Sequence, residues 1–251
     1  MISLKNKVSL ITGASRGIGR AAAIMFAQAG SHVIINYRKE ATAAEEVKRE
    51  CEKHGVRAMT VAADIADRGQ VNRMVDDVIS KFGRIDVLVN NAGIWEYNAI
   101  DGMDEARLKA TLDINVLGTF YPTMAVVPHM KKQKSGNIIN ISSTAGQRGE
   151  AFHSPYAASK GAIISLTKSW APELIMHNIR VNCVAPGWVD TDMSRESLES
   201  DEVADILRLI PMGRVGTPEE LAGPILFLAS DLSTFVVGEI LNVNGGAVLC
   251  G

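Results

Sequence analysis

The sequence has few of the residues that cross-link small secreted domains or hold structural metals. Only 3 of its 251 residues are cysteines, and Cys51, Cys183 and Cys250 lie far apart without a CxxC pair or a nearby histidine cluster. That scarcity excludes a zinc finger and a disulfide framework, and it fits a reducing compartment. We therefore expect a cytoplasmic protein that binds no metal.

Long apolar runs and an excess of either charge are also missing. No apolar stretch approaches the ~20 residues that a membrane-spanning helix needs, and the first residues lack a signal peptide's apolar core. The 26 basic and 28 acidic residues give a net charge of −2. This balance supplies no field that would attract nucleic acid or anionic membranes, so we expect neither as a partner.

What the sequence does contain is a regular alternation of strands and helices, and its 47% hydrophobic residues suffice for one large core. The β-branched runs are apolar throughout, which is typical of parallel strands covered on both faces. They are Val8–Ile11, Val33–Ile35, Ala58–Val61, Val87–Val89, Ile138–Ile141, Val181–Val184 and Ile240–Val243. Helical stretches such as Ala41–His54 and Arg68–Phe82 separate them. The pattern predicts one α/β domain over residues 1–251.

A glycine-rich loop, Thr12–Gly19, joins the first predicted strand to a helix expected at Arg20–Ala29. Glycines let the backbone approach a pyrophosphate, and the helix offers N–H groups and its positive dipole end to phosphates. The strict G-x-G-x-x-G pattern is not met because residue 22 is alanine, so a plain tight turn is the alternative. Polar residues at Asn36–Tyr37, Asp64 and Asn90–Gly93 end or follow the next three strands. Open α/β sheets bind ligands at that edge, so the clustering favours a nucleotide site.

Tyr156 and Lys160 begin a helix that is expected to run to about His177, and their spacing places them on one face. A phenol has an ordinary pKa of ~10, which a nearby ammonium lowers. Such a pair can give a proton to a carbonyl oxygen or remove one from an alcohol. An isolated pair of this kind is more often a core tyrosine beside a solvated lysine.

Two other features give that pair a catalytic context. The strand Asn137–Ile141 ends in Ser142 and Ser143, where a hydroxyl could bind a substrate oxygen. Asn115 lies in an otherwise apolar helical stretch. An amide that faces inward there is either a buried structural hydrogen-bonder or part of a polar relay.

With these motifs the chain resembles the short-chain dehydrogenase/reductase family from end to end. The matching segments are TGASRGIG at Thr12–Gly19, NNAG at Asn90–Gly93, NVLG with Asn115, Ser143, YAASK at Tyr156–Lys160 and PG-x-x-x-T at Pro186–Thr191. The resemblance implies a Rossmann-like, doubly wound sheet of about seven parallel strands with helices on both faces. It also implies a nicotinamide cofactor and a catalytic tetrad of Asn115, Ser143, Tyr156 and Lys160.

The resemblance assigns a role to each member of the tetrad. Tyr156 is the proton donor, and Ser143 orients the carbonyl. Lys160 lowers the pKa of the tyrosine and binds the nicotinamide ribose, while Asn115 holds a water of the proton relay. Ser143 is preferred because its spacing to the tyrosine matches the family, with Ser142 as the weaker candidate.

The cofactor site combines the glycine loop, the following strand ends and the catalytic helix. Its expected residues are Gly13, Ser15, Arg16, Gly17, Ile18, Gly19, Tyr37, Arg38, Asp64, Ile65, Asn91, Ala92, Gly93, Tyr156, Lys160, Pro186, Gly187, Val189 and Thr191. An NAD enzyme places a carboxylate at the end of the second strand, but Tyr37 stands there. Arg16 and Arg38 can flank a 2′-phosphate, so we expect NADP(H), with NAD(H) as the alternative.

Within the family the chain is most similar to bacterial 3-oxoacyl-[acyl-carrier-protein] reductases. Its segment Leu241–Gly246 resembles the carboxyl-terminal ending of those reductases. This implies reduction of a small-molecule or carrier-bound 3-oxoacyl thioester in fatty acid biosynthesis, by a homotetramer in which the apolar end Ala247–Leu249 is buried. Lys134, beside Lys131 and Lys132, and His177 stand where those reductases use arginines to receive the carrier. A lysine run is most often a solvated helix end. The alternatives are a sugar or polyol dehydrogenase and a non-catalytic dinucleotide-binding regulator.

Two further groups of residues concern the substrate. Trp95, Trp188, Phe152 and His153 either line a pocket for a bulky, cyclic or sugar-like substrate or pack under a lid. Residues 190–217 are polar and acidic, with one amphipathic piece at Val203–Ile210. A loop of that length is usually functional or mobile, so we predict a substrate lid, with a surface excursion as the alternative.

Overall fold

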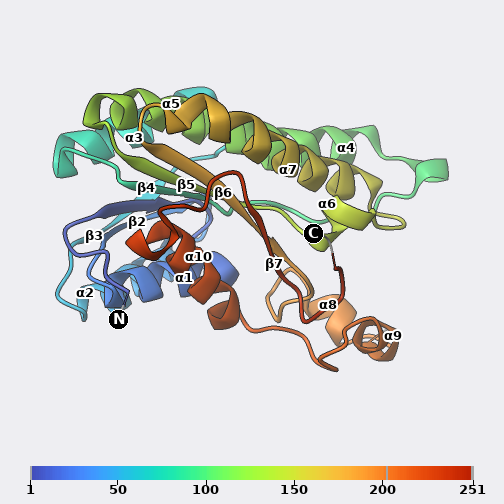
Figure 1. The fold of residues 1–251 in the computed structure, drawn as a ribbon. Helices are drawn as coiled ribbons and strands as arrows, with labels where there is room; N and C mark the ends of the chain where they lie inside the picture. Colours follow the sequence, from blue (N-terminus) through green and yellow to red (C-terminus); the bar gives the residue numbers. More distant parts are fainter. Residues whose placement is uncertain (1, 202, 250–251) are drawn as a thin grey trace.

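The computed structural model describes residues 2–201 and 203–249, and a sheet of seven parallel strands runs through its centre (Figure 1). The strands lie in the order β3-β2-β1-β4-β5-β6-β7. They are β1 (Val8–Ile11), β2 (His32–Tyr37), β3 (Ala58–Ala62), β4 (Val87–Asn90), β5 (Gly136–Ile141), β6 (Ile179–Pro186) and β7 (Ile240–Val243). The predicted Rossmann-like, doubly wound fold is confirmed.

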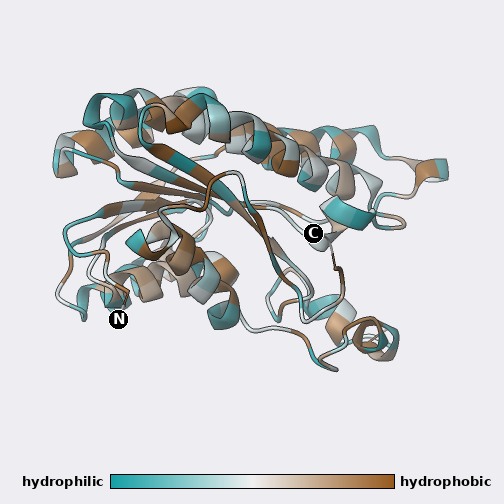
Figure 2. Cartoon of the chain, in the orientation of Figure 1, coloured by the Kyte–Doolittle hydropathy of each residue, from teal (hydrophilic) through white to brown (hydrophobic). Residues whose placement is uncertain are grey.

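Helices cover both faces of the sheet (Figure 1). One face carries α1 (Gly17–Gln28), α2 (Ala41–Glu52) and α10 (Pro218–Ala229), and the other carries α3 (Arg68–Phe82), α5 (Gly118–Gln133) and α7 (Ser154–Ile175). Shorter elements are η1 (Ile100–Gly102), α4 (Glu105–Leu112), the π-helical turn η2 (Asp113–Leu117), α6 (Thr144–Arg148), α8 (Arg195–Leu198), α9 (Val203–Arg208) and η3 (Asp231–Ser233). The strands carry many hydrophobic residues, whereas the helices that cover them carry both hydrophobic and hydrophilic residues (Figure 2).

Local sequence signals explain where several helices begin and end. Asp67 caps α3 by accepting a hydrogen bond from Gln70, and Gly83 ends that helix in the left-handed conformation. Thr217 forms a capping box with Glu220 at the start of α10. Helix α1 begins at Gly17, three residues before the predicted start, because the end of the glycine loop already adopts helical geometry.

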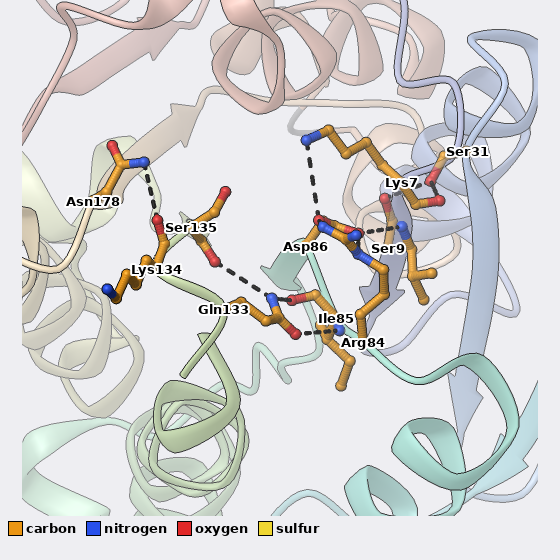
Figure 3. Close-up of polar contacts among 11 residues, drawn as sticks. Lys7, Ser9, Ser31, Arg84, Ile85, Asp86, Gln133, Lys134, Ser135 and Asn178 are labelled. Carbon is orange, nitrogen blue, oxygen red and sulfur yellow. Dashed lines mark hydrogen bonds and ion pairs between the residues drawn. The ribbon is translucent and has the colours of Figure 1, made fainter. Parts of the chain in front are cut away.

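Polar contacts around the buried Asp86 connect neighbouring strands at the side of the sheet where the strands begin (Figure 3). Its carboxylate accepts hydrogen bonds from the backbone N–H of Val8 at 2.9 Å and from Arg84 Nε at 2.8 Å. Lys134 precedes β5 at this same edge, where its carbonyl accepts a hydrogen bond from Asn178 Nδ2 (Figure 3). The lysine run therefore lies at the opposite edge of the sheet from the predicted nucleotide site of the same chain.

Residues 190–217 form a folded excursion that contains α8 and α9. Val189 pairs with Gly216 across its base, and the side chains of Ile206 and Ile210 are buried. Thus the predicted amphipathic piece exists, and it anchors the segment to the rest of the molecule. Across residues 2–201 and 203–249, no helix combines the length and apolar character that crossing a membrane requires.

Candidate active site

Two asparagines hold the glycine loop at the carboxyl-terminal edge of the sheet. The backbone N–H of Gly13 donates to Asn36 Oδ1 at 3.3 Å, and Asn91 Nδ2 donates to the Gly13 carbonyl at 3.1 Å. Gly13 has a φ of +62°, and a Cβ there would lie 2.9 Å from Ala92. A Cβ on Gly19 would lie 2.5 Å from Asn91 Nδ2. The loop can pack this closely only because these positions are glycine.

A cavity of about 350 Å³ extends from this loop to Tyr156. It is lined by nearly all the predicted site residues: Gly13, Ser15, Arg16, Gly17, Ile18, Tyr37, Arg38, Asp64, Ile65, Asn91, Ala92, Gly93, Ser143, Tyr156, Lys160, Pro186, Gly187, Val189 and Thr191. Gly19 and Asn115 are absent from its walls. The close-packed glycine loop and the N-terminus of α1 at its end fit the pyrophosphate of a dinucleotide.

Arg16 and Arg38 both line the cavity, and Arg38 directly follows Tyr37, the last residue of β2, which takes the place of a carboxylate. Arg38 Nη1 lies 3.7 Å from Asp64 Oδ2, and Arg16 Nη1 lies 3.8 Å from Asp192 Oδ2. The side chain of Arg38 is 50% exposed, and the side chain of Arg16 is 67% exposed. Exposed ion pairs contribute little free energy, so each guanidinium can turn toward a phosphate.

The structure distinguishes the two serines after β5. Ser142 is buried, and its hydroxyl donates to the Lys160 carbonyl at 2.7 Å. Ser143 is only half-buried, accepts a hydrogen bond from the N–H of Ala145 at 3.1 Å, and is hydrogen-bonded to Tyr156. Ser143 is therefore the serine whose hydroxyl meets the phenol in the cavity.

Burial dominates the protonation of Tyr156 and Lys160. It raises the pKa of Tyr156 to about 12, against the opposing effect of the Ser143 hydrogen bond. Burial also lowers the pKa of Lys160 to about 8. Lys160 Nζ lies 5.7 Å from the centre of the tyrosine ring and donates to the Ile141 carbonyl at 2.8 Å. The expected lowering of the tyrosine pKa by the lysine is absent here, because desolvation outweighs any attraction from the ammonium.

Asn115 lies in the π-helical turn η2 and is buried. Its Nδ2 donates to the Ile94 carbonyl at 2.9 Å and to Ser159 Oγ at 3.0 Å, while its Oδ1 accepts from the Ile94 N–H at 2.8 Å. These contacts tie the segment after β4 to helix α7. Asn115 is thus a buried hydrogen-bonder, and its role in a proton relay stays a prediction.

The predicted aromatic residues divide into two groups. Trp95 and Trp188 line the cavity with their ring centres 5.8 Å apart, and His153 stacks on Trp95 at 4.3 Å. Phe152 does not line the cavity and stacks on the exposed ring of Tyr97 at 5.7 Å. Trp95 and Trp188 thus form part of the cavity wall.

Arg148 and Glu150 are among the charged residues of this cavity that sequence reasoning missed. Both lie between Ser143 and Tyr156 in the sequence. Their position between two predicted catalytic residues could have indicated that they lie near the site. Trp95 Nε1 donates to Glu150 Oε2 at 3.4 Å. Burial raises the pKa of Glu150, opposed by the nearby charges of His153 and Arg148.

Comparison with known proteins identifies the family. A family model described as enoyl-(acyl carrier protein) reductase matches residues 13–248. The chain is 44% identical over 247 residues to the 3-oxoacyl-[acyl-carrier-protein] reductase FabG of Thermotoga maritima, covering 98% of this chain and 99% of that protein. The chain belongs to the short-chain dehydrogenase/reductase family. It is therefore an NAD(P)-dependent oxidoreductase.

Other short-chain dehydrogenases/reductases are similar over nearly the whole length. The 3-oxoacyl-[acyl-carrier-protein] reductase of Synechocystis sp. is 43% identical over 250 residues, which are 99% of this chain and 100% of that protein. A solved gluconate 5-dehydrogenase from Burkholderia cenocepacia, in complex with NADP and tartrate, has a TM-score of 0.93 at 36% identity, with 98% and 96% of the two chains covered. An NAD⁺-bound xylitol dehydrogenase has a TM-score of 0.91 at 32% identity, covering 96% and 99%.

Proposed function

We propose that this enzyme is an NADP(H)-dependent reductase of 3-oxoacyl thioesters, acting on the acyl-carrier-bound or the free thioester. The observation that carries the proposal is the pairing of Tyr156 with Ser143 in a cavity that continues to the glycine loop. With its pKa at about 12, the phenol holds its proton at neutral pH, which is the form that a carbonyl reduction needs. The names of the two bacterial reductases that resemble the whole chain support the same reaction.

In this proposal each side chain acts on the carbonyl oxygen or supports a group that does. Bound NADPH supplies the hydride that reduces the carbonyl carbon. Ser143 donates a hydrogen bond to the carbonyl oxygen, and Tyr156 gives its proton to that oxygen as negative charge develops. The Lys160 ammonium binds the cofactor ribose, and Asn115 keeps the wall after β4 fixed against α7.

The preference for NADP(H) rests on charge at the end of β2. Tyr37 offers no carboxylate to repel a 2′-phosphate, and Arg16 and Arg38 both line the cavity. Two guanidinium groups around one phosphate form charge-assisted hydrogen bonds, which are among the stronger polar contacts.

A homotetramer is part of the same proposal. Phe235 and Leu249 are apolar residues near the carboxyl end of the chain that remain exposed in a single protomer. Burying them against other copies would remove apolar surface from water. Sedimentation of the purified protein tests this part independently of activity.

A sugar or polyol dehydrogenase remains the second candidate function. It is favoured by the structural similarity to the gluconate 5-dehydrogenase and by the two tryptophans, Trp95 and Trp188, on which a sugar ring could stack.

A cofactor and substrate scan decides between the two functions. NADPH and NADH oxidation are followed with acetoacetyl thioesters, and NADP⁺ and NAD⁺ reduction with xylitol and gluconate. We expect kcat/KM to be highest for the thioester with NADPH. A higher kcat/KM for a polyol or sugar acid would overturn the proposed function.

A further inference from the structure

The substrate end of the cavity holds a carboxylate that the proposed proton transfer does not use. Glu150 follows α6 and is half-buried, and it lines the same cavity as Ser143 and Tyr156. The N–H of Trp95 fixes one of its oxygens at 3.4 Å. Because Glu150 lines the cavity wall and does not lie on the outer surface, we expect a substrate in the cavity to contact it.

The negative charge of Glu150 acts on the reacting end of the cavity. After burial, that charge is a further cause that raises the pKa of Tyr156. The basic side chains near Glu150 are His153 and Arg148. Arg148 is exposed to solvent, and neither forms an ion pair with Glu150 within 4.0 Å in the described part of the chain. The carboxylate is therefore not neutralised by direct contact.

We infer that Glu150 is a specificity-determining residue that selects ketones without a negative charge beside the reacting carbonyl. This inference rests on the proposed function and narrows its substrate class. Thioesters and esters of 3-oxo acids are neutral at that position, whereas the free 3-oxo acids carry a carboxylate there. Two carboxylates in one partly buried cavity repel each other. At separations of several ångströms this repulsion lowers the affinity for the acid by about ten-fold.

The test compares one ketone in its neutral and its anionic forms. With NADPH, kcat/KM is measured for the acetoacetyl thioester of N-acetylcysteamine, for ethyl acetoacetate and for acetoacetate. In Glu150→Gln the ratio of acid to thioester should rise about ten-fold over the wild type. Glu150→Asp keeps the charge and should keep a ratio near that of the wild type.

Glu96→Gln is the matched control, because Glu96 is exposed near the pocket and does not line the cavity. It should leave the ratio unchanged. A ratio in Glu150→Gln that equals the wild-type value, or one that Glu96→Gln raises equally, overturns the inference. A purely structural role would lower turnover of the acid and of the neutral ketones alike, without changing their ratio.

A binding measurement keeps the inference separate from the proposed function. Trp95 and Trp188 line the pocket, so quenching of tryptophan fluorescence reports binding of acetoacetate and ethyl acetoacetate without turnover. If the wild type reduces none of the ketones, the proposed function fails. The inference then still requires that Glu150→Gln bind acetoacetate about ten-fold more tightly while binding of the ester changes little. Equal affinities of wild type and variant for acetoacetate refute it.

Discussion

Replacing Lys160 with methionine should stabilise the fold while it removes a catalytic group. The ammonium is buried, and burial lowers its pKa from 10.5 to about 8. A shift of this size corresponds to about 3 kcal/mol against the charged form in the folded state. Methionine has a similar length, but it loses the hydrogen bond to the Ile141 carbonyl, which costs about 1 kcal/mol. The free energy of unfolding should therefore rise by about 2 kcal/mol at pH 7.

The pH dependence of this gain has a definite sign. Between pH 8 and 10.5 the lysine binds more protons in the unfolded chain than in the folded one. Stability of the wild type from this group therefore rises with pH through that window. Methionine has no such dependence, so its advantage should fall from about 2 kcal/mol at pH 7 to near zero at pH 9.5.

The assay is thermal or urea unfolding of Lys160→Met and wild type at both pH values. A gain of about 2 kcal/mol corresponds to roughly 4–8 °C in Tm for a chain of this length. Lys168→Met is the matched control, because Lys168 is an exposed lysine on the same helix, α7. A variant that is less stable than wild type at pH 7, or a gain that persists unchanged at pH 9.5, would refute the reasoning.

Three further predictions concern the cofactor, the glycine loop and the lid. Arg38→Ala should lower kcat/KM for NADPH by about ten-fold or more relative to NADH, and an unchanged ratio would show that the 2′-phosphate lies elsewhere. Gly19→Ala should cost about 1–3 kcal/mol in urea unfolding because its Cβ meets Asn91 and the Gly13 carbonyl at 2.5 Å, whereas Gly223→Ala, with nothing within 4 Å, should cost no stability. Residues 190–217 should exchange amide hydrogens more slowly once cofactor and substrate are bound, and equal exchange with and without ligands would contradict a lid.

The fold could be predicted closely because its signals are local. Strands buried on both faces are continuous apolar runs, so Val8–Ile11 and Ile240–Val243 were predicted with the bounds that the structure shows. Helix α3 was likewise predicted at Arg68–Phe82, between its capping aspartate and a terminal glycine. The π-helical turn at Asn115 was not predictable, because its geometry depends on contacts with Ile94 and Ser159.

The candidate site was predicted in its residues but not in its electrostatics. The motif spacing predicted that Tyr156 and Lys160 lie close together. The direction in which the pKa of Tyr156 shifts depends on burial, which a sequence pattern does not show. The pocket position of Glu150 is another such case, because it depends on the packing of Trp95 from a distant strand end. Residues 190–217 looked like a long polar loop, but Ile206 and Ile210 hold them against the molecule.

Turnover of Tyr156→Phe tests the central claim most directly. The variant keeps the ring that fills the cavity wall and loses only the hydroxyl that holds the proton. With an acetoacetyl thioester and NADPH, we expect kcat to fall by roughly two to four orders of magnitude. NADPH affinity, measured separately by fluorescence, should stay close to that of the wild type. Near-normal turnover by Tyr156→Phe would contradict the assignment of Tyr156 as the proton donor of this reductase.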